Sequence, residues 1–137
     1  MVRPEVIRKR LNKLDECLAI LHRLQAYPLD RFLSDPLCYG STERFLQLAI
    51  ETTADMGSHV IAESGWGPVN HYADIAAILA ARGFIPRELE AKWVRMIGFR
   101  NILVHDYLEI DRSIVYDVLQ CHLADLEALR QAFAQLL

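Results

Sequence analysis

The chain has 137 residues, 53% of them hydrophobic and 24% charged, which suits one globular domain and excludes an intrinsically disordered protein. Its formal net charge is −3. That charge argues against a broadly basic nucleic-acid-binding protein, so any contact with RNA requires a local basic cleft. No stretch reaches the roughly 18 apolar residues of a membrane span, and residues 1–14 lack the apolar run of a signal peptide. We therefore expect a cytoplasmic protein with no membrane contact.

The first half of the chain predicts two long helices. Residues 3–26 carry apolar residues at alternating spacings of four and three, which form one stripe: Ile7, Leu11, Leu14, Leu18 and Leu21. Asp35 followed by Pro36 is typical of a helix start, because aspartate caps free backbone N–H groups and proline fits the first helical turn. A second helix is predicted from there to about residue 62. Residues 63–70 hold two glycines and a proline and are predicted to form a loop.

The second half predicts three more helices. A short one covers residues 71–82 and ends before Gly83, and a longer one begins at Pro86 and runs towards residue 104. Asp111 is predicted to cap a last helix that reaches Phe133, with His122 as a core histidine. The buried stripe expected on this helix is Val115, Val118, His122, Leu126, Leu129 and Phe133. The expected fold is all-α: a single up-and-down bundle of four to five helices over residues 1–137.

Apolar residues are abundant for a bundle of this length, so some of them are expected at the surface. Trp66, Trp93 and residues 96–99 are the candidates for an exposed apolar patch. A homodimer would bury such a patch. An ordinary monomeric core is the alternative.

The three cysteines, Cys17, Cys38 and Cys121, lie far apart and form no Cys-x-x-Cys pair. An odd number at such spacings favours reduced, mostly buried thiols over a disulfide framework or a zinc site. The sequence also contains no phosphate-binding glycine-rich loop and no nucleophile elbow. We therefore expect neither a metal site nor a cofactor.

One charged side chain interrupts the apolar stripe of the fourth helix. Leu89, Trp93, Met96 and Leu103 lie on that stripe, and the position between the last two at helical spacing is Arg100. Burying an unpaired charge costs several kcal/mol. Arg100 is therefore expected to be paired, to face a water-filled cleft, or to lie at a subunit interface. An arginine whose head group reaches into water is the alternative.

Three polar residues follow Arg100 closely: Asn101, His105 and Tyr107. At about 100° per residue, Arg100 and Tyr107 lie near one face, whereas His105 lies about 140° round from Arg100. The arginine and the histidine converge only if the helix loosens near its end, or if two copies of the segment meet in a dimer. Asn101 lies one turn before His105 on the same face, where its amide can orient the imidazole.

A polar strip lies on the second helix. Glu51, Asp55 and His59 are spaced by four residues and share one face. They are tentative residues of the same cleft, or of a metal site, and surface salt bridging is the alternative. Arg44 lies on the same helix and can either pair with Glu51 or contact RNA.

Residues 100–107, RNILVHDY, resemble the motif of the HEPN domain: an arginine, a polar residue, three further residues and a histidine. The tyrosine two places after the histidine resembles the HepT subgroup of HEPN toxins. Residues 96–99 (MIGF) and 110–111 beside the motif, and 43–47 (ERFLQ) with 50–51 in the second helix, are similar to that subgroup as well. The resemblance covers nearly the whole chain.

This resemblance implies a metal-independent endoribonuclease, the toxin of a type II/VII-like toxin–antitoxin pair that cleaves mRNA or tRNA. Arg100 and His105 would be catalytic, with support from Asn101, at the cleft of a homodimer. Arginine holds phosphate oxygens and histidine transfers protons near neutral pH, so both suit RNA cleavage. A cognate MntA-like nucleotidyltransferase antitoxin would attach AMP to Tyr107 and block the cleft with bulk and negative charge. The alternative is a non-catalytic HEPN subunit that binds substrate or nucleotide for a separate nucleotidyltransferase.

Overall fold

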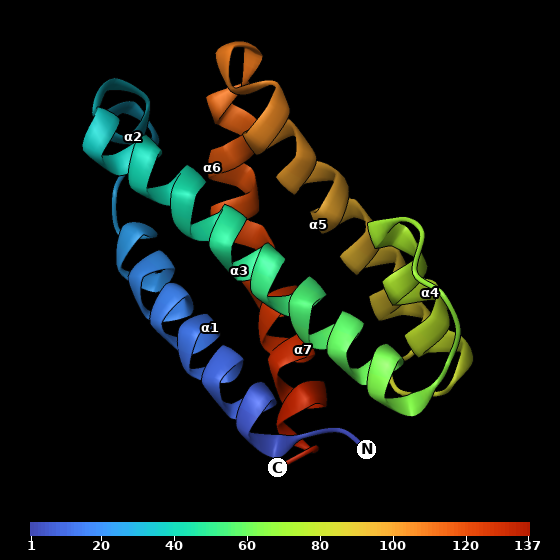
Figure 1. Ribbon diagram of the computed structural model, residues 1–137. Helices are drawn as coiled ribbons and strands as arrows, with labels where there is room; N and C mark the ends of the chain where they lie inside the picture. The colour runs from blue at the N-terminus through green and yellow to red at the C-terminus, as the bar shows by residue number, and fades with distance from the viewer.

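Four long helical rods form an antiparallel bundle in the computed structural model, which describes residues 1–137 (Figure 1). The rods are α1 (Pro4–Leu24), α3 (Pro36–Ser64), α5 (Arg87–His105), and α6 (Arg112–Cys121) continued by α7 (Leu123–Ala134). Two short helices, α2 (Leu29–Ser34) and α4 (Tyr72–Ala81), and the 3₁₀ turn η1 (Tyr107–Glu109) lie in the connections. The predicted all-α up-and-down bundle is confirmed. Both chain ends lie at the same end of it.

Helix α3 is the central rod, because it packs against α1, α5, α6 and α7 as well as both short helices. It begins at the predicted cap, where the Asp35 side chain accepts a hydrogen bond of 2.9 Å from the Leu37 N–H. It ends at Gly65, whose φ of 66° lies in the left-handed region that glycine adopts without strain. A helix this long reaches from one end of the bundle to the other and gives the site residues a rigid support.

The first half of α5 is fixed to α3 by a buried tryptophan. Trp93 is fully buried, and its indole N–H donates to the Thr53 hydroxyl at 3.1 Å. Its ring meets Phe133 of α7 edge-on, with 6.0 Å between the ring centroids. Gly57 of α3 leaves room for this packing, since a Cβ there would lie 3.1 Å from Trp93 and overlap Ile75. These contacts set the position of the second half of α5, which carries the candidate site.

The last predicted helix is in fact two helices, and the prediction of a core histidine was wrong. The chain breaks between α6 and α7 at His122, whose side chain is 53% exposed and lies 3.3 Å from the Asp125 carboxylate. The buried stripe runs through Leu119 and Leu123 instead of Val118 and His122. Because the stripe shifts by one residue here, the histidine turns outward. Helix α2 was not predicted; it forms after Pro28 and buries Phe32.

The predicted exposed patch was also wrong in its residues. Trp93, Met96 and Ile97 are buried within the single chain, and Trp66 and Phe99 are partly buried against the core. The large apolar side chains that do stand exposed at this end of α5 come later, at Ile102 and Leu108. Leu108 lies in η1, which projects from one end of the bundle (Figure 1).

The three thiols are free. Cys17 and Cys38 are buried as predicted, whereas Cys121, beside the break between α6 and α7, is exposed. None of the helices combines the length and the apolar character that crossing a membrane requires.

Candidate active site

The guanidinium of Arg100 is paired within the chain, which is one of the alternatives that the sequence left open. Its Nε donates to Glu51 Oε1 of α3 at 2.9 Å, and its Nη2 donates to the same oxygen. The Arg100 side chain is only 18% exposed and that of Glu51 30% exposed, so the pair lies at the edge of the core. Helix α3 therefore holds the arginine in one orientation. An ion pair between two helices also explains how a charged side chain can occupy a position on the apolar stripe of α5.

Glu51 is held by a second donor on its own helix. Gln47, one turn earlier, donates to Glu51 Oε1 at 3.1 Å. Partial burial by itself would raise the pKa of Glu51, but the hydrogen bonds from Arg100 and Gln47 and the nearby charge of Arg44 lower it below its ordinary value. Glu51 is therefore ionised at neutral pH and remains a fixed anchor for Arg100.

Two further side chains surround Arg100. The Tyr72 ring of α4 lies beneath the guanidinium, with 5.6 Å between the guanidinium carbon and the ring centroid. Asn101 Oδ1 accepts a hydrogen bond of 3.2 Å from Arg100 Nη1. Arg100 is thus held from α3, α4 and α5 at once, which is the kind of pre-organisation that a phosphate-binding arginine requires.

His105 is exposed at the last position of α5 and is not in contact with Arg100 within one chain. The helix continues without interruption through both residues, so the loosened helix end that would let them converge does not occur. Asn101 was expected to orient the imidazole, but its amide oxygen is bonded to Arg100 instead. Asn101 therefore contacts the arginine rather than the histidine.

Tyr107 follows in η1 and is 61% exposed. Its hydroxyl makes no hydrogen bond within the chain, so nothing in the fold shields the oxygen. The neighbouring Asp106 and Glu109 are exposed as well. The end of the motif is therefore accessible to solvent.

The strip Glu51, Asp55 and His59 does not act as one unit. Only Glu51 contacts Arg100. His59 Nε2 accepts a hydrogen bond of 3.3 Å from the Arg3 backbone N–H, so it ties the start of α1 to α3. Asp55 lies between the two and faces α1. No group of three or more His, Cys, Asp or Glu side chains is arranged to hold a metal ion.

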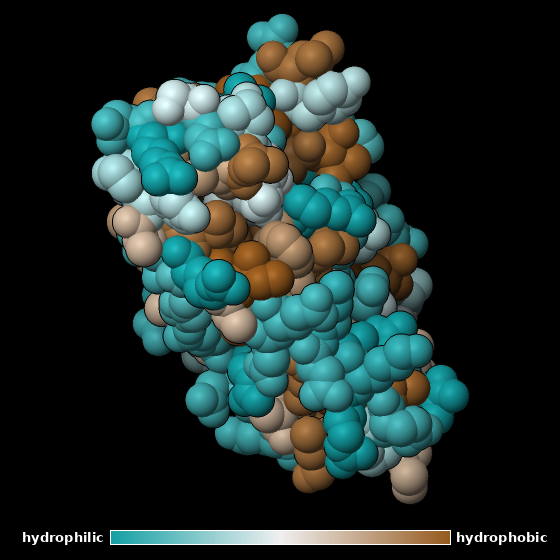
Figure 2. Space-filling view, turned by 90° about the vertical axis from the view of Figure 1, so that its left-hand side faces the viewer, coloured by the Kyte–Doolittle hydropathy of each residue, from teal (hydrophilic) through white to brown (hydrophobic).

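A local basic groove lies beside this strip, between α1 and α3. It has a volume of about 520 Å³ and is lined only by polar residues, among them Lys9, Arg10, Lys13 and Asp55. Lys9 and Arg10 form no ion pair, and Lys13 contacts only Glu16, at 3.6 Å. Hydrophilic side chains cover the lower half of the face on the α1 side (Figure 2). Asp55 of this groove lies one helical turn from Glu51, so a chain of net negative charge still carries a local cluster of cations along α1.

Sequence reasoning missed two residues of this site. Gln47 lies four residues before Glu51, so helical spacing alone could have paired them. Tyr72 could not have been found that way, because only the packing of α4 against α5 brings its ring to Arg100.

Comparison with known proteins agrees with this geometry. The family described as Ribonuclease HepT-like matches residues 14–133. The mRNA nuclease HepT of Shewanella oneidensis is 31% identical over 119 residues, which cover 85% of this chain and 90% of that protein. The tRNA nuclease HepT of Aphanizomenon flos-aquae is 31% identical over 117 residues, covering 84% of this chain and 78% of that protein.

The fold is similar to that of a solved structure, the tri-AMPylated HEPN toxin of Shewanella oneidensis in complex with an MNT antitoxin. The TM-score is 0.88 at 26% identity, over 95% of this chain and 97% of that chain. The predicted HepT resemblance and the prediction of a ribonuclease family are confirmed. The chain belongs to the HepT-like ribonuclease family.

Proposed function

We propose that this protein is a toxin endoribonuclease in which Arg100 and His105 perform metal-independent cleavage of RNA. The observation that carries the proposal is the mostly buried Arg100 guanidinium, fixed by Glu51 and Tyr72, with an exposed histidine five residues later on the same helix. In the reaction, the RNA 2′-oxygen attacks the adjacent phosphorus and the bond to the 5′-oxygen breaks. One histidine accepts the proton of the 2′-hydroxyl, another protonates the leaving 5′-oxygen, and arginine stabilises the phosphate charge.

A homodimer supplies the two histidines. Arg100 and His105 lie about 140° apart on a helix that stays regular, so one chain cannot aim both side chains at one phosphate. Two copies that meet along this part of α5 place the arginine of one protomer near the histidine of the other. The exposed apolar side chains of Ile102 and Leu108 provide surface for such a contact.

Tyr107 is the proposed target of an MntA-like nucleotidyltransferase antitoxin. Its hydroxyl is exposed and unbonded, and a related toxin is AMPylated. The tyrosine oxygen would attack the α-phosphorus of ATP, releasing pyrophosphate and the phenolic proton. The attached AMP carries negative charge close to the proposed RNA site and would repel the substrate. Intact mass after co-expression with the antitoxin tests this: wild type gains whole AMP units, and Tyr107→Phe gains none.

The cleavage test uses purified protein, single-stranded RNA and EDTA. General acid–base catalysis contributes about 10²–10⁴-fold, so His105→Ala is expected to lose that much rate. Arg100→Ala is expected to lose about 10²–10³-fold, as for other groups that stabilise developing charge. Two matched controls keep their rates: His122→Ala, an exposed histidine beside Asp125, and Arg130→Ala, an arginine paired with Asp15.

Full activity of folded His105→Ala would contradict the proposal. A wild-type protein that cuts no RNA, yet still accepts AMP, would favour the alternative of a non-catalytic subunit that binds substrate or nucleotide for a nucleotidyltransferase.

A further inference from the structure

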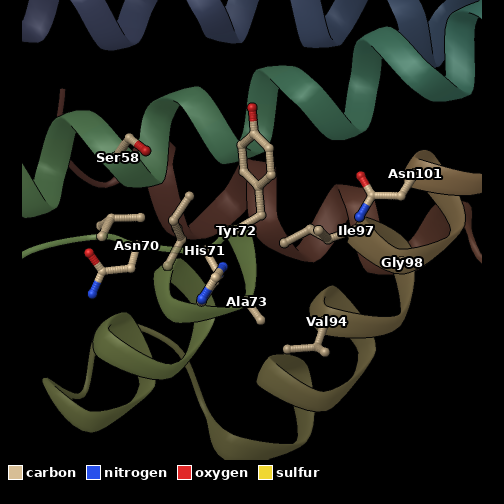
Figure 3. A pocket seen from close by; sticks show the side chains of 11 residues that line it. Ser58, Asn70, His71, Tyr72, Ala73, Val94, Ile97, Gly98 and Asn101 are labelled. Atoms are coloured by element: carbon tan, nitrogen blue, oxygen red, sulfur yellow. The ribbon is translucent and has the colours of Figure 1, made fainter. Parts of the chain in front are cut away.

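A second concave site lies next to Arg100, on the opposite side from the basic groove. It has a volume of about 560 Å³ and opens between the segment that leads into α4 and the middle of α5. Figure 3 shows Tyr72 standing between α3 and α5, with Asn70 and His71 on one side of the pocket and Ile97 and Asn101 on the other. Pockets that hold small molecules have volumes of about 300–1,000 Å³, so this one is large enough for a nucleoside.

The lining of this α4–α5 pocket suits an uncharged ring. None of its eleven lining residues is Lys, Arg, Asp or Glu. Its polar groups are two amides, a hydroxyl, an imidazole and a phenol, all of which can match the hydrogen-bonding edge of a heterocycle. Aliphatic side chains such as Ile97 and Val94 supply an apolar wall. A phosphate or carboxylate would meet no cation among the lining residues, whereas a nucleobase would meet both hydrogen-bonding groups and an apolar wall.

The pocket is joined directly to the proposed phosphate site. Tyr72 lines it and also lies beneath the Arg100 guanidinium. Asn101 lines it and accepts a hydrogen bond from Arg100. Gly98 and Asn101 flank Arg100 on α5, so a phosphate held by the arginine has its own nucleoside within reach of the pocket. Proteins that read single-stranded RNA bind splayed-out bases in this way, by stacking and by edge hydrogen bonds.

We infer that the α4–α5 pocket binds one unstacked nucleobase of single-stranded RNA, next to the phosphate held by Arg100. The inference rests on the proposed function and adds to it, because the base in this pocket selects the site of cleavage. Asn70 supports the assignment, since its side-chain amide lies at the pocket and makes no hydrogen bond within the chain. Such an amide can donate to and accept from one base edge at the same time.

Gly98→Leu is the sharpest test, because it places an apolar side chain in the pocket from a position where the added Cβ meets no other atom. A Cβ at Gly98 meets nothing within 4 Å, and the same is true of Gly40 in α3, which does not line the pocket. Both glycines lie inside helices, where glycine is less favourable than a residue with a side chain. Gly40→Leu is therefore a matched control. We expect Gly98→Leu to cleave short single-stranded RNAs at least tenfold more slowly, and Gly40→Leu to cleave them at the wild-type rate.

A second variant reports on base choice. Asn70→Ala and wild type are compared on a set of short RNAs that differ in one base beside the cleaved bond. Wild type is expected to prefer one base over the others, and Asn70→Ala is expected to lose that preference. Gly98→Leu that is folded, of wild-type mass in light scattering, and unchanged in rate and base preference would overturn the inference. So would dissociation of Gly98→Leu into monomers, because the pocket would then face a second protomer.

A binding experiment distinguishes failure of the base-pocket inference from failure of the ribonuclease proposal. Binding of the same short RNAs is measured by fluorescence anisotropy in a His105→Ala background, where cleavage is expected to be about 10²–10⁴-fold slower. If RNA binds more weakly when Gly98→Leu is combined with His105→Ala, but not when Gly40→Leu is, the result supports the base pocket even if wild type cuts no RNA. Equal binding by both, in a protein whose wild type does cleave, overturns the base pocket and leaves the ribonuclease proposal intact.

Discussion

The two halves of α5 belong to one continuous helix but have opposite surroundings. In the first half, Trp93 and Met96 are buried, and the indole is hydrogen-bonded to Thr53. In the second half, Ile97 and Leu103 still face the core, but Asn101 and His105 are exposed. The tryptophan fixes the direction of the helix, and the second half extends its polar residues from that fixed base. The main packing anchor and the residues of the proposed chemistry therefore lie on different halves of one helix.

This separation can be tested by substitution. Changes in the packed half are expected to alter the free energy of unfolding and to leave cleavage by the folded protein unchanged. Changes to the exposed polar residues of the second half are expected to do the reverse.

Trp93→Ala has the largest expected effect on stability. It removes a fully buried ring and the donor to the Thr53 hydroxyl, so the free energy of unfolding falls by about 3–5 kcal/mol. Urea denaturation followed by circular dichroism measures the change. Val94→Ala is the control: the neighbouring side chain is 37% exposed, and its loss changes stability by less than about 0.5 kcal/mol. Equal stability of Trp93→Ala and wild type would refute the claim that the first half of α5 anchors the helix.

Gly57→Ala tests the same anchor from the side of α3. Alanine raises helix propensity by about 0.5–1 kcal/mol, but its methyl group would overlap Ile75 and press on Trp93. Overpacking of this kind costs about 1–3 kcal/mol, so the net result is destabilisation. Gly40→Ala, with free space at its Cβ, is expected to stabilise the protein. Thermal melts compare the stability of both variants with that of wild type. A stabilised Gly57→Ala would show that α3 and α4 move apart easily.

Glu51→Gln tests the ion pair that holds Arg100. The partly buried pair with Arg100 contributes about 1 kcal/mol at neutral pH. Because the pKa of Glu51 is lowered in the folded protein, this contribution is present above its ordinary value of 4.5 and is lost as the pH falls through the lower folded value. The difference in stability between wild type and Glu51→Gln should therefore vanish in acid. Cleavage should also slow, since Arg100 loses its anchor; a pH-independent difference would contradict the ion-pair account.

Tyr107→Phe has the smallest expected effect on stability. The tyrosine is exposed and its hydroxyl is unbonded, so the free energy of unfolding changes by less than about 0.5 kcal/mol. Denaturation curves that overlay those of wild type are the expected result. A marked loss of stability would mean that the hydroxyl has a structural partner, and that any loss of AMPylation in this variant is indirect.

Much of the fold could be predicted from local patterns. The α1 stripe, the Asp35 cap and Gly65 at the end of α3 all act within a few residues, so sequence spacing was sufficient to find them. The break at His122 could not be predicted, because the apolar stripe continues on either side with a shift of one residue. The exposed patch was misplaced for a related reason. Whether Trp93 is covered depends on Thr53 and Phe133, which are distant in sequence.

The sequence by itself determined that the chain is helical, which family it resembles, and that Arg100 needs either a partner or access to water, since helical period and the cost of burying a charge are local physics. Only the tertiary structure decided which partner it takes. Glu51 lies 49 residues earlier and Tyr72 comes from a third helix, and no spacing rule connects such positions. The α4–α5 pocket is likewise invisible in the sequence, because a cavity is the space left between elements after they pack.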